Sequence, residues 1–196
     1  MAKRRRTRIR VPPAEKAIQL KVTLCDTKPL IWRRITVPDN FTLGWLHSVI
    51  QVAMGWHDGH MHAFRIGDDE YTSEKACEMD DLGMKNEEVV LLDSVITQEK
   101  QVFSYEYDFG DGWEHEIVVE KFLPVDPLVK HPVCLAGKRA CPPDDCGGVP
   151  GYEDILKALK AKKKTEDRQE MLAWLGDYDP AHFDKEEVNR ILRSVE

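Results

Sequence analysis

Two strand-like segments joined by a glycine-rich turn constrain the fold of this chain most strongly. Every second side chain is aromatic in residues 103–109, and Trp113, His115, Ile117 and Val119 repeat with the same period in the segment that follows. Residues 110–112 read Gly-Asp-Gly, a composition typical of tight turns. Alternation with a period of two is typical of a half-buried strand. The pattern therefore predicts a β-hairpin with an aromatic face, and with it a sheet-based fold.

Similar patterns predict the remaining elements. Residues 18–25 and 31–37 indicate a second hairpin, and residues 60–66 a further strand with His60 and His62 on one face. A helix is expected between Thr42 as N-cap and Gly55 as its left-handed end. Three more helices are expected over 153–163, after Thr165, and after Asp184. Residues 124–151 contain six prolines and four glycines and are predicted to be irregular.

These elements predict an α+β fold, in which a mixed or antiparallel sheet carries a packed helix and C-terminal helices follow. The order is compatible with a β-grasp-like core. We expect a basic flexible arm over 1–14 and a single α+β domain over 15–196. Within that domain we expect a sheet core over 17–123, a Cys/Pro-rich loop over 124–151 and a helical cap over 152–196.

The charge is divided unevenly along the chain. The net charge is −7, from 28 basic and 35 acidic residues. The first ten residues hold six cations and no acid, which leaves −13 for residues 11–196. Such an acidic body is a poor binder of phosphate backbones, so any nucleic-acid or acidic partner is expected to contact the arm. Its cations are Lys3, Arg4, Arg5, Arg6, Arg8 and Arg10.

The sequence also predicts the cellular setting of the chain and argues against several enzyme classes. The 196 residues include no apolar run of the length that a membrane span needs and no apolar signal region. An odd cysteine count of five without such a signal predicts a reducing, cytoplasmic setting. Motifs of serine hydrolases, Walker NTPases, dinucleotide-binding enzymes and zinc peptidases are absent. The Asp-Phe-Gly at 108–110 lacks the other motifs of a kinase.

Three groups of residues are candidates for function. Cys134, Cys141 and Cys146 fall in the Pro/Gly-rich segment and could bind zinc, with a fourth ligand such as His131 or His115; buried thiols are the alternative. His60 and His62 could bind a metal or share a proton, or be ordinary strand residues. Asp108, Asp111 and Glu114 could hold a hard cation or act in acid–base chemistry, or simply form a turn.

Several motifs, in this order along the chain, resemble the plasmid pRiA4b ORF-3-like family. They are Ile31-Trp32-Arg33-Arg34, Trp45-Leu46-His47, Gly55-Trp56 with His60 to Phe64, Tyr107 to Asp111 with Trp113-Glu114-His115, and Cys141 to Gly148 with Gly151-Tyr152. The resemblance covers about residues 17–180. It implies an α+β fold and a cytoplasmic bacterial or archaeal protein of uncharacterised role, and it supplies no catalytic residues.

Three functions remain open. The first is a ligand- or protein-binding module with an aromatic and histidine-lined cleft. The second is a metal-dependent hydrolase that uses Asp108, Asp111 and His115, or a Cys/His-bound metal such as zinc. The third is a nucleic-acid-associated accessory protein that acts through the arm. The residues expected to line the cleft are Trp56, His60, His62, Tyr107, Asp108, Asp111, Trp113 and His115.

Overall fold

A computed structural model describes residues 12–79, 83–125, 131–163 and 165–195. Its strands are β1 (Lys16–Leu24), β2 (Ile31–Pro38), β3 (His62–Ile66), β4 (Asp69–Thr72), β5 (Lys85–Asn86), β6 (Val102–Tyr107), β7 (Trp113–Pro124) and β8 (Val133–Lys138). Its helices are α1 (Leu43–Met54), α2 (Glu74–Met79), the 3-10 turn η1 (Glu87–Val89), α3 (Leu92–Val95), α4 (Gly148–Lys160), α5 (Glu166–Leu175) and α6 (Lys185–Leu192).

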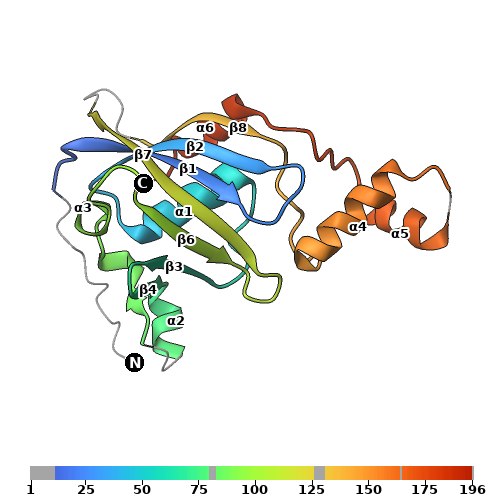
Figure 1. The fold of residues 1–196 in the computed structure, drawn as a ribbon, viewed down its shortest axis with the longest axis horizontal. Helices are drawn as coiled ribbons and strands as arrows, with labels where there is room; N and C mark the ends of the chain where they lie inside the picture. The colour runs from blue at the N-terminus through green and yellow to red at the C-terminus, as the bar shows by residue number, and fades with distance from the viewer. Residues whose placement is uncertain (1–11, 80–82, 126–130, 164, 196) are drawn as a thin grey trace.

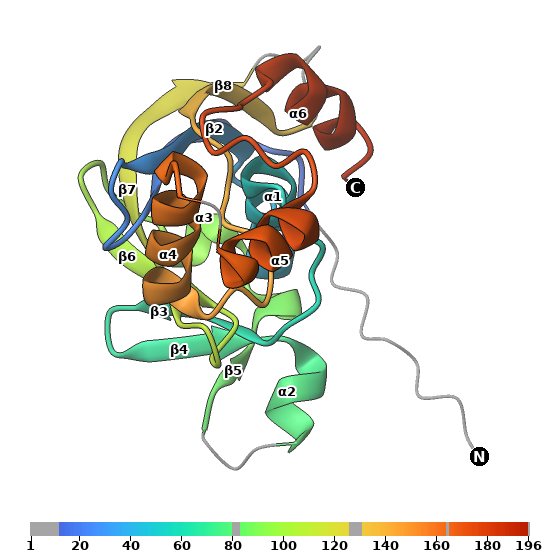
Figure 2. The same cartoon turned by 90° about the vertical axis from the view of Figure 1, so that its right-hand side faces the viewer.

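The strands form one eight-stranded sheet in the order β5-β4-β3-β6-β7-β1-β2-β8. All neighbours are antiparallel except β4 and β5, which run parallel. The sheet curves around α1, with β8 and β2 on one side of the helix and β3 and β4 on the other (Figure 2). The α+β class predicted from the sequence is therefore confirmed.

Both predicted hairpins and the predicted first helix are present. The alternating apolar side chains of β1 point into the core, where Ile18, Leu20 and Leu24 are fully buried. Thr42 caps α1 by accepting a hydrogen bond from the Trp45 N–H, and Gly55 closes it with a φ of 107°. These features were predictable because alternation, caps and turns depend on residues close together in the chain.

The segment 124–151 is not irregular throughout, which corrects the sequence prediction. Residues 133–138 form β8, which pairs with β2 at the edge of the sheet. Only Cys134 is fully buried in this strand, so no alternating apolar pattern marks it. Its outer edge is covered by α6, where the Asn189 amide accepts from the Cys134 N–H (2.7 Å) and donates to the Cys134 carbonyl (2.9 Å).

Two other regions contain short helices and strands that the sequence pattern does not reveal. Residues 67–87 contain β4, α2 and β5. Residues 89–95 include the end of η1 and the whole of α3. These elements have two to six residues, too few to establish a period.

The C-terminal helices differ in how they meet the sheet. The helices α4 and α5 pack on one another and extend away from the curved sheet, while α6 returns to β8 and α1 (Figure 1). Asp184 caps α6 as predicted, by accepting from the N–H groups of Glu186 and Glu187. Within the described ranges, no helix has the length and apolar character that a bilayer span requires.

Candidate functional site

Four of the residues expected to line a cleft lie in the interior. Trp56 is 5% exposed, and Tyr107, Trp113 and His115 are fully buried. The Trp56 ring contacts the other three, with centroid distances of 4.8, 6.1 and 5.3 Å, and its indole N–H donates to the Pro142 carbonyl. The structure thus places these side chains in the packed core under the sheet. A contact between them and a ligand stays a prediction.

His115 has a different environment from Asp108 and Asp111, the carboxylates with which the hydrolase hypothesis grouped it. Its Nδ1 contacts the Tyr105 carbonyl at 3.1 Å, and its Nε2 is buried without a hydrogen-bond partner. Burial lowers the pKa of His115 to about 4. The ring is therefore neutral near pH 7 and packs as a core side chain. Among the described residues, it joins no set of metal-ligating groups.

The cysteine trio is likewise not assembled as a ligand set. Cys134 and Cys141 are buried, Cys146 is half-buried, and all are free thiols. Burial raises the pKa of Cys141 well above its usual range and that of Cys146 to about 12. In the described part of the chain, the groups that bring metal-ligating atoms within 4.8 Å of one another contain histidines and carboxylates, and no cysteine.

One of these groups brings together three distant segments at the surface. His60 Nδ1 lies 3.5 Å from an Asp108 carboxylate oxygen, and His60 Nε2 lies 3.5 Å from Asp145. We call His60, Asp108 and Asp145 the surface centre. The His60 side chain is 28% exposed and that of Asp145 is 77% exposed, so solvent reaches the centre.

The turn between β6 and β7 positions Asp108. This residue has a left-handed φ of 56°, and its Oδ1 accepts from the N–H groups of Gly110 (3.0 Å) and Asp111 (3.3 Å). Its own N–H donates to the Met61 carbonyl, which ties the turn to the segment that carries His60. The second carboxylate oxygen of Asp108 is left to face the His60 ring.

The same turn holds the segment that carries Asp145. Asp111 accepts a hydrogen bond from the Gly147 N–H at 3.2 Å. A Cβ atom at Gly148 would lie 2.4 Å from the Asp111 carbonyl oxygen, so the two backbones approach closely enough to require glycine. The Tyr107 hydroxyl lies 3.5 Å from the neighbouring Asp144, and desolvation raises the pKa of that carboxyl.

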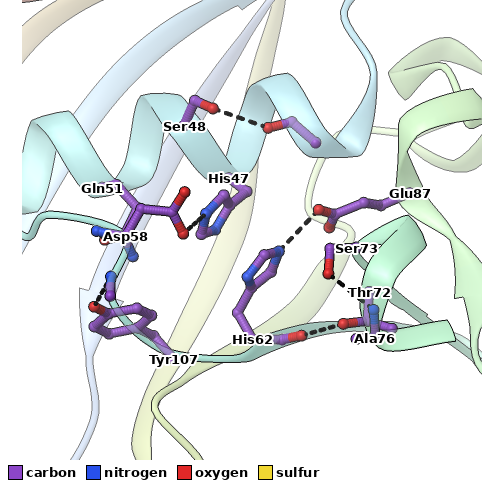
Figure 3. Close-up of polar contacts among 12 residues, drawn as sticks. His47, Ser48, Gln51, Asp58, His62, Thr72, Ser73, Ala76, Glu87 and Tyr107 are labelled. Atoms are coloured by element: carbon purple, nitrogen blue, oxygen red, sulfur yellow. Dashed lines mark hydrogen bonds and ion pairs between the residues drawn. The ribbon is translucent and has the colours of Figure 1, made fainter. Parts of the chain in front are cut away.

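A second group lies deeper, between α1 and β3 (Figure 3). The rings of His47 and His62 are stacked, with centroids 3.5 Å apart and planes at 7°. His47 Nε2 lies 2.8 Å from Asp58, and His62 Nε2 lies 2.9 Å from Glu87. We call His47, Asp58, His62 and Glu87 the buried centre, after its two histidines and Glu87; the Asp58 side chain is 62% exposed.

Tyr105 and Gln51 orient the buried centre from the core. The Tyr105 hydroxyl lies 2.8 Å from His47 Nδ1 and accepts from the Gln51 amide at 3.0 Å. The side-chain oxygen Oε1 of Gln51 accepts a hydrogen bond from the Asp58 backbone N–H. This bond fixes the loop before β3. Burial lowers the pKa of His47, and the hydrogen bond from His47 lowers that of Asp58. The imidazole is therefore neutral and the carboxylate ionised at neutral pH.

The structure divides the predicted site residues among different places. His60, Tyr107, Asp108 and Asp111 gather around the surface centre, whereas His62 belongs to the buried centre. Asp144 and Asp145 were overlooked because the Pro-Pro-Asp-Asp-Cys turn was interpreted through its cysteine. His47 and Glu87 carried no local signal. The six cations of the arm lie outside the described residues.

Comparison with known proteins gives relatives along almost the whole chain. The sequence model of the plasmid pRiA4b ORF-3-like protein family matches residues 16–187. The uncharacterized protein y4hQ of Sinorhizobium fredii (strain NBRC 101917 / NGR234) is 38% identical over 175 residues, which cover 88% of this chain and 89% of that protein. The crystal structure of MM3350, a protein of unknown function from Methanosarcina mazei Go1, matches with a TM-score of 0.80 and 37% identity, over 89% of this chain and 98% of that chain. Neither relative carries an assigned activity.

Proposed function

The chain belongs to the plasmid pRiA4b ORF-3-like family, and we propose that it is a ligand-binding module whose ligand is a divalent cation held at the surface centre. The observation that carries the proposal is the convergence of one imidazole and two carboxylates from three segments that are far apart in the sequence. The 108–112 turn is joined to the other two segments by the Asp108 N–H, which donates to the Met61 carbonyl, and by the Asp111 carboxylate, which accepts from the Gly147 N–H.

The distances within the surface centre are compatible with a bound ion. Both His60 contacts measure 3.5 Å, longer than a strong N–H···O bond of about 2.9 Å. Adjacent ligands of an octahedral ion lie about 3.0 Å apart when each is about 2.1 Å from the ion, so a shift of about 0.5 Å brings one ring nitrogen and its carboxylate to that spacing. One ring nitrogen can bind the ion while the other donates its N–H to a carboxylate, which is the usual arrangement around metal-bound histidines.

The charge of the surface centre supports the same proposal. In the part of the chain that the structure describes, Asp108 and Asp145 form ion pairs with His60 and with no Lys or Arg. Asp144 lies close enough that Asp145 raises its pKa and His60 lowers it. Clustered carboxylates repel one another, and a divalent cation removes that repulsion. One imidazole with several carboxylates is a donor set that suits Mn²⁺ or Mg²⁺.

The solvent exposure of the surface centre favours a second function, metal-dependent hydrolysis. Protein groups on one side of an ion leave coordination positions for water, and a bound water is the nucleophile of metal-dependent hydrolases. The proposed hydrolase uses Asp108 with His60 and Asp145 in place of His115. A panel of phosphate and carboxylic esters, assayed with Mn²⁺, tests this function; hydrolysis by the Asp145→Asn variant at the wild-type rate would exclude it.

Calorimetric titration with Mn²⁺ tests the cation site itself. Asp145→Asn removes one charged ligand at an exposed position, and Asn tolerates the left-handed backbone at φ 57°. We expect this variant to bind Mn²⁺ at least about tenfold more weakly, because ligand charge sets cation affinity. Asp26→Asn is the matched control, since Asp26 is also exposed and also has φ 57°. Equal Mn²⁺ affinity for Asp145→Asn and the wild type would contradict the proposal.

A further inference from the structure

The buried centre is a second cluster of metal-ligating groups, distinct from the surface centre. Its four side chains come from α1, the loop before β3, β3 itself and η1, and they form two pairs, His47 with Asp58 and His62 with Glu87, joined by the stacked imidazole rings (Figure 3). The ligand atoms of His47, Asp58 and His62 lie within 4.8 Å of one another. Glu87 contacts this trio through His62 at 2.9 Å.

Glu87 has a buried carboxylate oxygen without a hydrogen-bond partner among the described residues. Its side chain is 2% exposed, and one carboxylate oxygen contacts His62 while the other, Oε2, is buried without a hydrogen-bond partner. A buried carboxylate oxygen is normally paired, because it has lost its water without replacement. Among the described residues, His62 is the ionic partner of Glu87. The unpaired oxygen lies at the edge of a cluster of potential ligands.

In the described part of the chain, the carboxylates of the buried centre have no cationic Lys or Arg beside them. Asp58 and Glu87 pair instead with histidines. A divalent cation would interact favourably with both carboxylates.

We propose that His47, Asp58 and His62 bind zinc, with Glu87 orienting His62, independently of the surface centre. Two imidazoles and one carboxylate provide three zinc ligands, and Glu87 holds His62 as the carboxylate partner of a metal-bound histidine does. The Tyr105 hydroxyl holds His47 Nδ1, which leaves Nε2 as the ligand atom, and such a partner is typical of metal-bound histidines. The planes of the two rings are nearly parallel and do not meet at one ion, so one ring turns when zinc binds.

Zinc retention by the full chain tests this site. The untagged wild-type protein, loaded with Zn²⁺ and dialysed, is expected to keep about one tightly bound zinc per chain. Glu87→Gln keeps a hydrogen-bond acceptor for His62 but removes the charge, and is expected to bind zinc about 10–100-fold more weakly. Glu74→Gln, an exposed position on α2, is the matched control. Asp145→Asn should retain zinc as the wild type does, which separates this site from the surface centre.

The absorption spectrum of the Co²⁺-loaded wild-type chain tests the same site without any substitution. Ligation by imidazole and carboxylate gives d–d bands and no sulfur-to-cobalt charge transfer. A charge-transfer band from sulfur would assign the metal to the cysteines and overturn the proposal. Loss of zinc from the wild type on dialysis, or wild-type zinc affinity in Glu87→Gln, would overturn it as well. If Glu87→Gln does not fold, zinc retention by Asp145→Asn and the Co²⁺ spectrum of that variant decide, because the variant weakens the surface centre; loss of zinc from it would overturn the proposal.

Discussion

Buried His115 makes the stability of this fold dependent on pH. Its pKa falls from 6.5 to about 4 because the ring is fully buried, and the hydrogen bond to the Tyr105 carbonyl only partly opposes this fall. The unfolded chain takes up a proton below pH 6.5, whereas the folded chain does not until about pH 4. The contribution of neutral His115 to the free energy of unfolding is therefore fully present above pH 6.5. This contribution is lost as the pH falls toward 4. By pH 4.5 the loss amounts to about 2.5 kcal/mol, at 1.36 kcal/mol per pH unit.

Urea denaturation at pH 7.5 and at pH 4.5 measures this effect. Asn at position 115 can still donate to the Tyr105 carbonyl but does not titrate, so His115→Asn should lose about 2.5 kcal/mol less than the wild type between the two pH values. Its stability at pH 7.5 should be lower, because the smaller side chain leaves a cavity. His182→Asn, at an exposed histidine, should keep the wild-type pH dependence. Equal losses in the wild type and His115→Asn would refute a neutral, buried His115.

Three further predictions concern how distant segments are joined. Arg33 is buried and donates to five backbone carbonyls at the end of α1, in β2 and around the end of β8. Arg33→Met should therefore lower the free energy of unfolding, measured in urea, by about 3–5 kcal/mol. A loss below about 1 kcal/mol would contradict this role. Asn189→Ala should cost about 1–2 kcal/mol by the same measurement, because both backbone groups of Cys134 lose their partner; unchanged stability would show that water replaces the amide. Gly148→Ala should weaken Mn²⁺ binding in calorimetry, since the new Cβ meets the Asp111 carbonyl and displaces the segment with Asp145; unaltered affinity would rule out that coupling.

The parts of the fold that were predictable are those set by neighbours in the chain. The β6–β7 hairpin follows from alternation around a Gly-Asp-Gly turn, and α1 follows from Thr42 and Gly55 at its ends. Strand β8 was missed because its pairing with β2 and its cover by Asn189 are long-range contacts. Its own residues show no period that would reveal them.

In the candidate sites, too, the predictable residues are those in local sequence motifs, and the others are brought together only by the fold. His60 and Asp108 stood out because each lies in a dense local motif, but their partner Asp145 lies in a segment that only the fold brings near. His47 was not chosen because a single histidine on an amphipathic helix has no local sign of function. Glu87 looked like one acid among 35 acidic residues, and only its burial distinguishes it.

The most direct test of the cation-binding proposal is a crystal structure of the wild-type chain soaked in Mn²⁺, with anomalous data collected near the manganese absorption edge. We predict an anomalous peak within about 2.1–2.3 Å of one His60 ring nitrogen and of an Asp145 carboxylate oxygen, with Asp108 in the coordination shell or hydrogen-bonded to the other ring nitrogen. A structure in which His60 and Asp145 keep their positions and no anomalous peak lies between them would contradict the proposal.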